Sequence, residues 1–146
     1  DVYKRQDGNP TISTLWKISN GMKVPFDALT VRPKSLYEIV KTSEIQPLLE
    51  DGGKVKNYSL FPDDENRRFA VYYLELDRES YWESEPHLKG TTEFITIFAG
   101  KIEICADGHK FEVEKGESIR FKADTVHSYK NIGDEQVILH MILYNP

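Results

Sequence analysis

Residues 101–114 read KIEICADGHKFEVE, and this stretch decides the fold class. Ile102 and Ile104 alternate with polar residues before the centre of the stretch, and the same alternation resumes after it, as in half-buried strands. Asp107-Gly108 lies between the two halves and predicts a tight β-hairpin, because a type I′ turn needs positive φ at both central residues. We therefore expect antiparallel β-structure around this hairpin.

Short apolar segments of the same kind recur on both sides of the hairpin, separated by Gly-containing turns. The predicted strands are Leu36–Lys41, Lys56–Phe61, Arg68–Leu76, Glu93–Ala99, Lys101–Ala106, Lys110–Glu114, Ser118–Phe121, His127–Lys130 and Gln136–Tyr144. Many short strands with no helical run between them predict a mainly β fold, either a sandwich or a barrel.

Composition bounds the class of protein. The chain has 146 residues, 39% of them hydrophobic and 12% aromatic, which suits one domain with a buried core. Its longest apolar run is far shorter than the ~20 residues that cross a bilayer, and the single Cys105 excludes an internal disulfide. The net charge is −5, and acidic side chains outnumber basic ones beyond residue 30, so that part is a poor surface for nucleic acid. We expect a cytoplasmic protein with no membrane partner.

The first 35 residues differ from the rest. Residues 1–6 read DVYKRQ, and their back-translation is similar to the end of a transposase sequencing adapter, so we expect an artefact there and a native chain that continues upstream. Residues 7–30 repeat apolar side chains at helical spacing, with Pro25 suited to the start of a second short helix. Two helices this small cannot bury their apolar faces alone. Residues 31–35 are predicted to be a linker.

Two stretches far apart in the sequence contain the residues that could bind a ligand or a metal. In the first, Glu85 and His87 would share one face of an extended segment at ~6.6 Å, and Glu93 begins the next strand. The second stretch ends in His127. Two imidazoles and two carboxylates converging in a barrel would form a site for a transition metal such as Fe, Mn, Ni or Zn.

A metal-free pocket is the alternative that these residues leave open. In it the same side chains would bind an effector by hydrogen bonds and charge, and their acidity would favour a cationic or amine-bearing ligand. Tyr72 and Tyr73 are adjacent on a predicted strand, so one faces the interior and the other the outside. We take Tyr73 as a further candidate ligand-binding residue, with packing in the core as the alternative.

The two stretches resemble the two motifs of the cupin superfamily. Gly116, His127 and Asn131 lie at the spacing of the second motif, while His87 and Gly100 match positions of the first. The resemblance covers roughly residues 36–146. It implies a mainly β cupin fold, the double-stranded β-helix or jelly-roll barrel, with the site inside it.

The match to the cupin motifs has departures. Glu85 stands where the first motif has its first histidine, and Glu93 lies one residue later than the usual glutamate. In the second motif Lys122 replaces a proline and Asp124 replaces a glycine. A late glutamate of this kind is similar to that of the cupin subgroup fused to helix-turn-helix domains.

The segment NPTISTL at residues 9–15, followed by VPF at residues 24–26, resembles the last two helices of the phage-repressor-like (XRE) helix-turn-helix domain. The resemblance covers residues 7–30 and lacks the recognition helix, so it implies DNA binding through a full-length parent only. A helical arm packed on the main domain is the alternative.

Together the resemblances imply a transcriptional regulator in which the cupin domain senses a small-molecule effector and forms a homodimer. The glutamate and histidine candidates (Glu85, His87, Glu93 and His127) would then bind the effector or a metal, without catalysis. A small metal-dependent cupin enzyme, of isomerase or dioxygenase type, is the first alternative. A carbohydrate-binding or purely structural β-sandwich is the second.

Overall fold

The computed structural model describes residues 36–146. The expectations of an adapter artefact at residues 1–6, a helix-turn-helix remnant at 7–30 and a linker at 31–35 therefore lie outside the described residues. Within the described part, no helix is long and apolar enough to cross a membrane.

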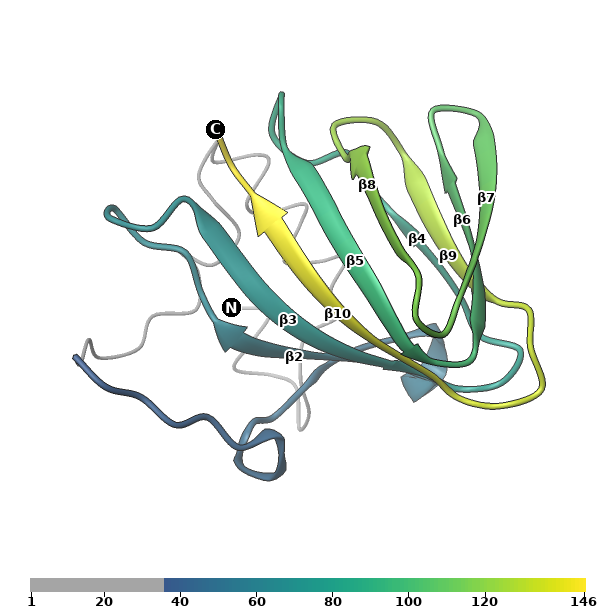
Figure 1. The fold of residues 1–146 in the computed structure, drawn as a ribbon, viewed down its shortest axis with the longest axis horizontal. Helices are drawn as coiled ribbons and strands as arrows, with labels where there is room; N and C mark the ends of the chain where they lie inside the picture. The colour runs from purple at the N-terminus through teal and green to yellow at the C-terminus, as the bar shows by residue number, and fades with distance from the viewer. Residues whose placement is uncertain (1–35) are drawn as a thin grey trace.

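Two antiparallel sheets form the structure and confirm the mainly β fold. The larger sheet has the order β1-β2-β3-β10-β5-β8, and the smaller has the order β4-β9-β6-β7. Figure 1 shows the smaller sheet lying against the β5–β8 side of the larger one. The strands are β1 Leu48–Glu50, β2 Val55–Phe61, β3 Phe69–Leu76, β4 Tyr81–Ser84, β5 Thr92–Ala99, β6 Lys101–Ala106, β7 His109–Glu114, β8 Ser118–Lys122, β9 His127–Asn131 and β10 Val137–Tyr144. Two 3-10 turns, η2 Thr42–Glu44 and η3 Asp51–Gly53, flank β1.

The core lies between the inward faces of the two sheets. Along β10 buried and half-buried residues alternate, which is the period of two that a strand imposes. The larger sheet contributes aliphatic side chains from β3, β5 and β10, and the smaller contributes them from β6 and β7. The main members are Leu74, Leu76, Ile95, Ile97, Ile102, Ile104, Val113, Leu139, Met141 and Leu143. Burial of this apolar surface is the main force that holds the sheets together.

The hairpin predicted at Asp107-Gly108 is confirmed. Ala106 pairs with His109 across the turn, and Asp107 and Gly108 have φ of 50° and 76°. Both central residues are thus left-handed, as a type I′ turn requires.

All the predicted strands but the first are confirmed, with ends that shift by one residue or less. The prediction of a strand at Leu36–Lys41 is wrong: the segment is not a strand and pairs with none of the strands in residues 36–146, and Leu36 and Ile39 are exposed. An apolar-rich sequence alone does not make a strand where no neighbouring edge satisfies the backbone. The sequence also missed two short strands, β1 and β4.

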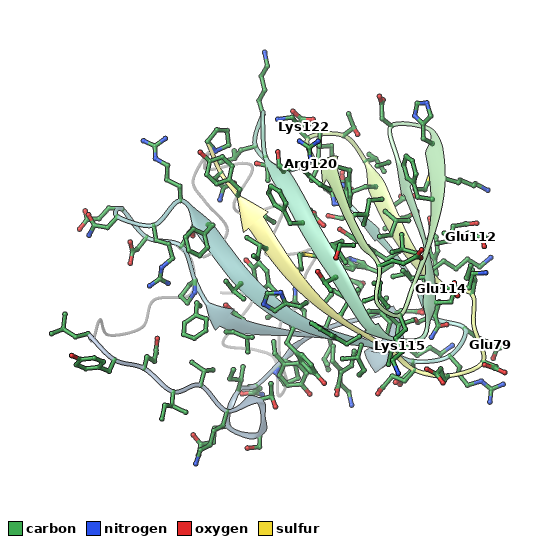
Figure 2. All side chains as sticks on the ribbon, viewed as in Figure 1. Glu79, Glu112, Glu114, Lys115, Arg120 and Lys122 are labelled. Atoms are coloured by element: carbon green, nitrogen blue, oxygen red, sulfur yellow. The ribbon has the colours of Figure 1, made fainter. Side chains whose placement is uncertain are left out.

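Charged side chains follow the two outer strands β7 and β8, each at the edge of its sheet. Figure 2 shows Glu112 and Glu114 on β7 and Arg120 and Lys122 on β8, and all four are exposed. Exposed charges at sheet edges disfavour pairing with another chain.

Gly100 joins β5 to β6 and is the tightest glycine of the described chain. Its φ is +83°, and a Cβ placed there would lie 2.9 Å from Val137 Cγ2 and 3.0 Å from the Gln136 carbonyl oxygen. We expect Gly100→Ala to lower the free energy of unfolding by about 1–2 kcal/mol for the left-handed backbone and by roughly 1 kcal/mol more for the close contacts. Urea denaturation measures the loss.

Gly108→Ala is the matched control. Gly108 also has a positive φ, +76°, but nothing lies within 4 Å of the position of its Cβ. The control should therefore show the backbone cost alone, and an equal loss in both variants would contradict the role of the close contacts.

Candidate functional site

The two chemically interesting stretches meet at one end of the barrel. His87 lies in the loop between β4 and β5, and its amide donates a hydrogen bond to the carbonyl of Ala123 (3.0 Å), just after β8. The Gly90 amide donates to Asp124 Oδ2 (2.8 Å), so a second bond ties the same two loops. These bonds bring residues about 35 positions apart in the chain into one structure.

Four buried side chains converge beneath these loops. Glu93 is the second residue of β5, and His127 is the first residue of β9. Glu93 Oε2 lies 3.0 Å from His87 Nε2 and 3.0 Å from His127 Nε2. The Tyr129 hydroxyl donates a hydrogen bond to the other carboxylate oxygen, Glu93 Oε1. We call His87, Glu93 and His127 the His–Glu–His cluster.

Burial and close ionisable neighbours shift the pKa values of the cluster residues. Burial raises the pKa of Glu93, but His127 and His87 outweigh it and hold this pKa well below its usual range. Burial lowers the pKa of His127, yet the charge and hydrogen bonding of Glu93 raise it overall. For His87 burial prevails and the pKa is lowered, and for Tyr129 burial and Glu93 raise the pKa well above its usual value. These directions favour an ionised Glu93, a protonated His127 and a neutral His87.

His127 has a defined orientation. Its Nδ1–H donates to the Thr125 carbonyl oxygen (2.7 Å), which leaves Nε2 facing Glu93. His127 Nε2 lies 3.0 Å from Glu93 Oε2, so the two side chains form a close charged contact when the imidazole is protonated. A backbone carbonyl on one ring nitrogen with the other nitrogen directed into a buried site is the usual arrangement of a metal-ligating histidine.

The ion pair predicts a pH dependence in chelator-treated protein. Because the pKa of His127 is raised above 6.5 in the folded state, its stabilising effect is fully present below pH 6.5 and is lost as the pH rises through the folded value. Stability should fall above pH 6.5 with a slope of up to about 1.4 kcal/mol per pH unit. Urea denaturation between about pH 6 and 8.5 measures it. His127→Gln should lack this slope, and an unchanged slope in the variant would assign the effect to another group.

The structure brings together three of the five sequence-predicted site residues: His87, Glu93 and His127. Glu85 is exposed and is not a member of the cluster, because residues 85–91 form a loop and the alternation of an extended strand does not apply there. Tyr73 lies on the outer face of β3, where its hydroxyl donates to Glu75 Oε2 (3.3 Å), and Tyr72 is the buried one of the pair.

The sequence did not single out Tyr129 as part of the site. Tyr129 follows His127 by two positions on β9, so the period of two places both side chains on one face of the strand. That spacing was the signal that could have found it. Trp82, directly opposite Tyr129 on β4, stacks on its ring with centroids 4.8 Å apart and a 20° angle between planes.

The donor set fits a divalent transition metal. One atom from each member of the His–Glu–His cluster lies within 4.8 Å of the others, and all three residues are buried. Two imidazole nitrogens and one carboxylate oxygen suit Fe, Mn, Ni or Zn better than Mg or Ca. His87, Glu93 and His127 are therefore the described residues that could hold such an ion.

Asn131, the last residue of the second motif, has a structural place outside the cluster. Its side-chain amide donates to the carbonyl oxygens of Leu76 (3.1 Å) and Glu135 (2.8 Å), and its Oδ1 accepts from the Gly133 amide (3.0 Å). It thus ties the end of β9 to the end of β3 and to the turn before β10.

Comparisons with known proteins agree with this architecture. The cupin domain profile matches residues 79–143, a range that contains the whole His–Glu–His cluster. The HTH-type transcriptional regulator SutR of Escherichia coli (strain K12) is 32% identical over 143 residues, which cover 98% of this chain and 76% of SutR.

Two solved structures of transcriptional regulators are also similar to this chain. The crystal structure of an HTH_3 family transcriptional regulator from Vibrio cholerae aligns with a TM-score of 0.77 and 29% identity, over 96% of this chain and 75% of that one. The cupin domain of an XRE family transcriptional regulator from Enterobacter cloacae aligns with a TM-score of 0.61 and 28% identity, over 64% of this chain and 98% of that one.

Proposed function

The chain belongs to the family of helix-turn-helix transcriptional regulators that carry a cupin domain, and from this membership we propose that its barrel is the sensor of a DNA-binding regulator. A small-molecule effector binds at the His–Glu–His cluster, and binding changes the affinity of the helix-turn-helix domain for operator DNA. The observation that supports this proposal is the joint burial of His87, Glu93 and His127, whose exposed fractions are 7%, 1% and 1%.

Burial of these ionisable groups argues for a binding role. A buried ion pair adds little net stability compared with apolar side chains of the same volume, because the charges lose their hydration. Buried groups with strongly shifted pKa values are accordingly more frequent at functional sites than in ordinary cores. The cluster is therefore the natural place for an effector or for the metal ion that receives one.

We further propose that His87, Glu93 and His127 hold a divalent transition metal, Fe, Mn, Ni or Zn. When bound, the metal supplies coordination positions that an effector can occupy. In the metal-free protein the charge of Glu93 is balanced by His127, and both of its oxygens have partners. Glu85 is exposed and outside the cluster. The acidity of these two glutamates therefore no longer favours a cationic or amine-bearing effector.

The proposed regulator acts in the cytoplasm, where it contacts DNA. It acts as a homodimer, because operators read by such domains usually have two-fold symmetry. An effector changes DNA binding only if it binds the DNA-competent and incompetent arrangements with different affinities. In this proposal the helix-turn-helix domain contacts DNA, and effector binding in the barrel changes the affinity of that domain for the operator.

The proposal predicts ligand-dependent stabilisation that requires the cluster. Thermal unfolding of the metal-loaded protein in a panel of small metabolites should reveal an effector that, at 100 times its dissociation constant, stabilises the fold by about 2.7 kcal/mol. The stabilisation should disappear in His127→Gln and persist in Glu85→Gln, because Glu85 is exposed and outside the cluster. The same metabolite should then change operator binding by the complete gene product in a mobility-shift assay.

Two outcomes would contradict the sensor proposal. A metabolite that stabilises His127→Gln as much as the unsubstituted protein binds elsewhere. A metabolite that binds at the cluster without changing operator affinity would make the barrel a binding domain without a regulatory role.

The metal-fitting cluster also supports one alternative, a small metal-dependent cupin enzyme of isomerase or dioxygenase type. Such an enzyme needs an acid or base beside the metal. Glu93, the carboxylate of the cluster, already has contacts with both histidines and Tyr129. Turnover of a candidate substrate by the metal-loaded protein, absent in His127→Gln, would favour this alternative over the sensor.

A further inference from the structure

The Tyr129 hydroxyl donates a hydrogen bond to Oε1, one of the two carboxylate oxygens of Glu93. We propose that Tyr129 is a positioning residue that leaves Glu93 a single oxygen, Oε2, with which to bind a metal ion at the His–Glu–His cluster. This inference rests on the proposed metal binding, and it concerns how one residue outside the donor set controls the carboxylate.

Tyr129 is held rigidly enough for this role. Its side chain is fully buried (0% exposed) on β9, an inner strand of the smaller sheet. On one side it is opposite Trp82, which stacks on its ring, and on the other it is opposite Ile104 of β6. The phenol ring therefore cannot turn aside without disturbing the packing of both neighbouring strands.

The hydrogen bond of Tyr129 crosses from one sheet to the other. Glu93 belongs to β5 of the larger sheet, whereas Tyr129 and His127 belong to β9 of the smaller one. The bond thus fixes the carboxylate group from the far side of the barrel. A donor at Oε1 selects the rotation of the group in which Oε2 lies 3.0 Å from both histidine nitrogens.

The consequence is a one-oxygen ligand. A free carboxylate can bind a cation through one oxygen or through both. Because Oε1 accepts a hydrogen bond from the Tyr129 hydroxyl, only Oε2 remains for a cation shared with His87 and His127. Loss of the hydroxyl would free Oε1 and allow the carboxylate to rotate or chelate.

The outer face of the larger sheet contains a matched Tyr–Glu pair for comparison. The Tyr58 hydroxyl donates to Glu75 Oε1 (3.4 Å), and neither residue belongs to the cluster. Tyr58→Phe therefore removes the same chemical group from the same kind of acceptor without touching the site.

The experiment uses Ni²⁺ and Co²⁺ as probes. The protein is first treated with a chelator to remove bound metal, and the chelator is then removed. Calorimetric titration should show Ni²⁺ binding about 10–100-fold weaker in Tyr129→Phe, the usual effect of losing a hydrogen bond to a ligand. Tyr58→Phe should bind as the unsubstituted protein does. The visible spectrum of bound Co²⁺ should change in Tyr129→Phe alone, because the carboxylate changes its mode of binding.

Each outcome decides something different. Equal affinity and an unchanged Co²⁺ spectrum in Tyr129→Phe overturn the positioning role and leave the proposed metal binding intact. No Ni²⁺ or Co²⁺ binding by the unsubstituted protein overturns the metal proposal and this role with it. If circular dichroism shows that Tyr129→Phe does not fold, Trp82→Phe is tested in its place. This variant keeps the Tyr129 hydroxyl but weakens the stacking that holds the phenol ring. A several-fold loss of Ni²⁺ affinity then supports the inference, and unchanged binding overturns it.

Discussion

Replacement of Glu93 by alanine is expected to lower the free energy of unfolding by about 3–5 kcal/mol, the usual result of removing one partner of a buried ion pair. Glu93 is 1% exposed, contacts His87 and His127 and accepts a hydrogen bond from Tyr129. Without it, His127 must lose its proton or remain a buried unpaired charge, and the Tyr129 hydroxyl loses its acceptor. Urea denaturation near neutral pH in the presence of a chelator measures the folding effect separately from any metal.

Glu75→Ala is the control for the loss of a glutamate that accepts tyrosine hydroxyls. Glu75 accepts from Tyr58 and Tyr73, but it lies on the half-buried outer face of β3. We expect its replacement to cost about 1 kcal/mol or less, because water can satisfy the hydroxyls. Equal losses in Glu93→Ala and Glu75→Ala would show that the buried cluster is not a centre of stability.

Replacement of Trp82 by alanine is expected to cost about 3–5 kcal/mol, as for other large aromatic side chains removed from a core. Trp82 is 3% exposed and stacks on Tyr129. Its indole nitrogen has no hydrogen-bond partner among the described residues, so the loss measures packing and not a broken hydrogen bond. Near-ultraviolet circular dichroism should report the change at Tyr129 together with the loss of Trp82 itself.

Tyr81→Ala is the matched control on the same strand. Tyr81 points to the other face of β4, is 47% exposed, and its hydroxyl donates to Glu83 (3.2 Å). We expect a change within about 0.5 kcal/mol, typical of surface positions. If Tyr81→Ala destabilised the protein as much as Trp82→Ala, the packing of β4 against β9 would not be the cause.

The fold was largely predictable because strand patterns are local. Alternation and turn residues located the hairpin at Asp107-Gly108 and the long strands of both sheets. The pattern failed at two places: the apolar-rich segment Leu36–Lys41 pairs with no strand of the described residues, and β4 buries Ser84 as well as Trp82. A small polar residue on the inward face conceals the hydrophobic period of a strand.

The site was predictable only in part, because spacing in a loop does not determine direction. His87, Glu93 and His127 were found from their residue types and their positions near strand ends. Glu85 was expected on the face of His87 by the geometry of a strand, whereas the segment is a loop. For Tyr72 and Tyr73 the period predicted opposite faces but not which residue faced inward, since that depends on the packing of the neighbouring strands.

The sequence by itself determined a mainly β fold, since strand period and turn residues are properties of neighbouring positions, and the choice of a barrel over a sandwich came from the resemblance to the cupin motifs. Only the tertiary structure decided what Glu93 contacts. Its three partners come from the β4–β5 loop and from β9, and they approach from the loop at one end and from the opposite sheet. Contacts between sheets depend on register and side-chain packing across the core, and neither is written in the local pattern of any one strand.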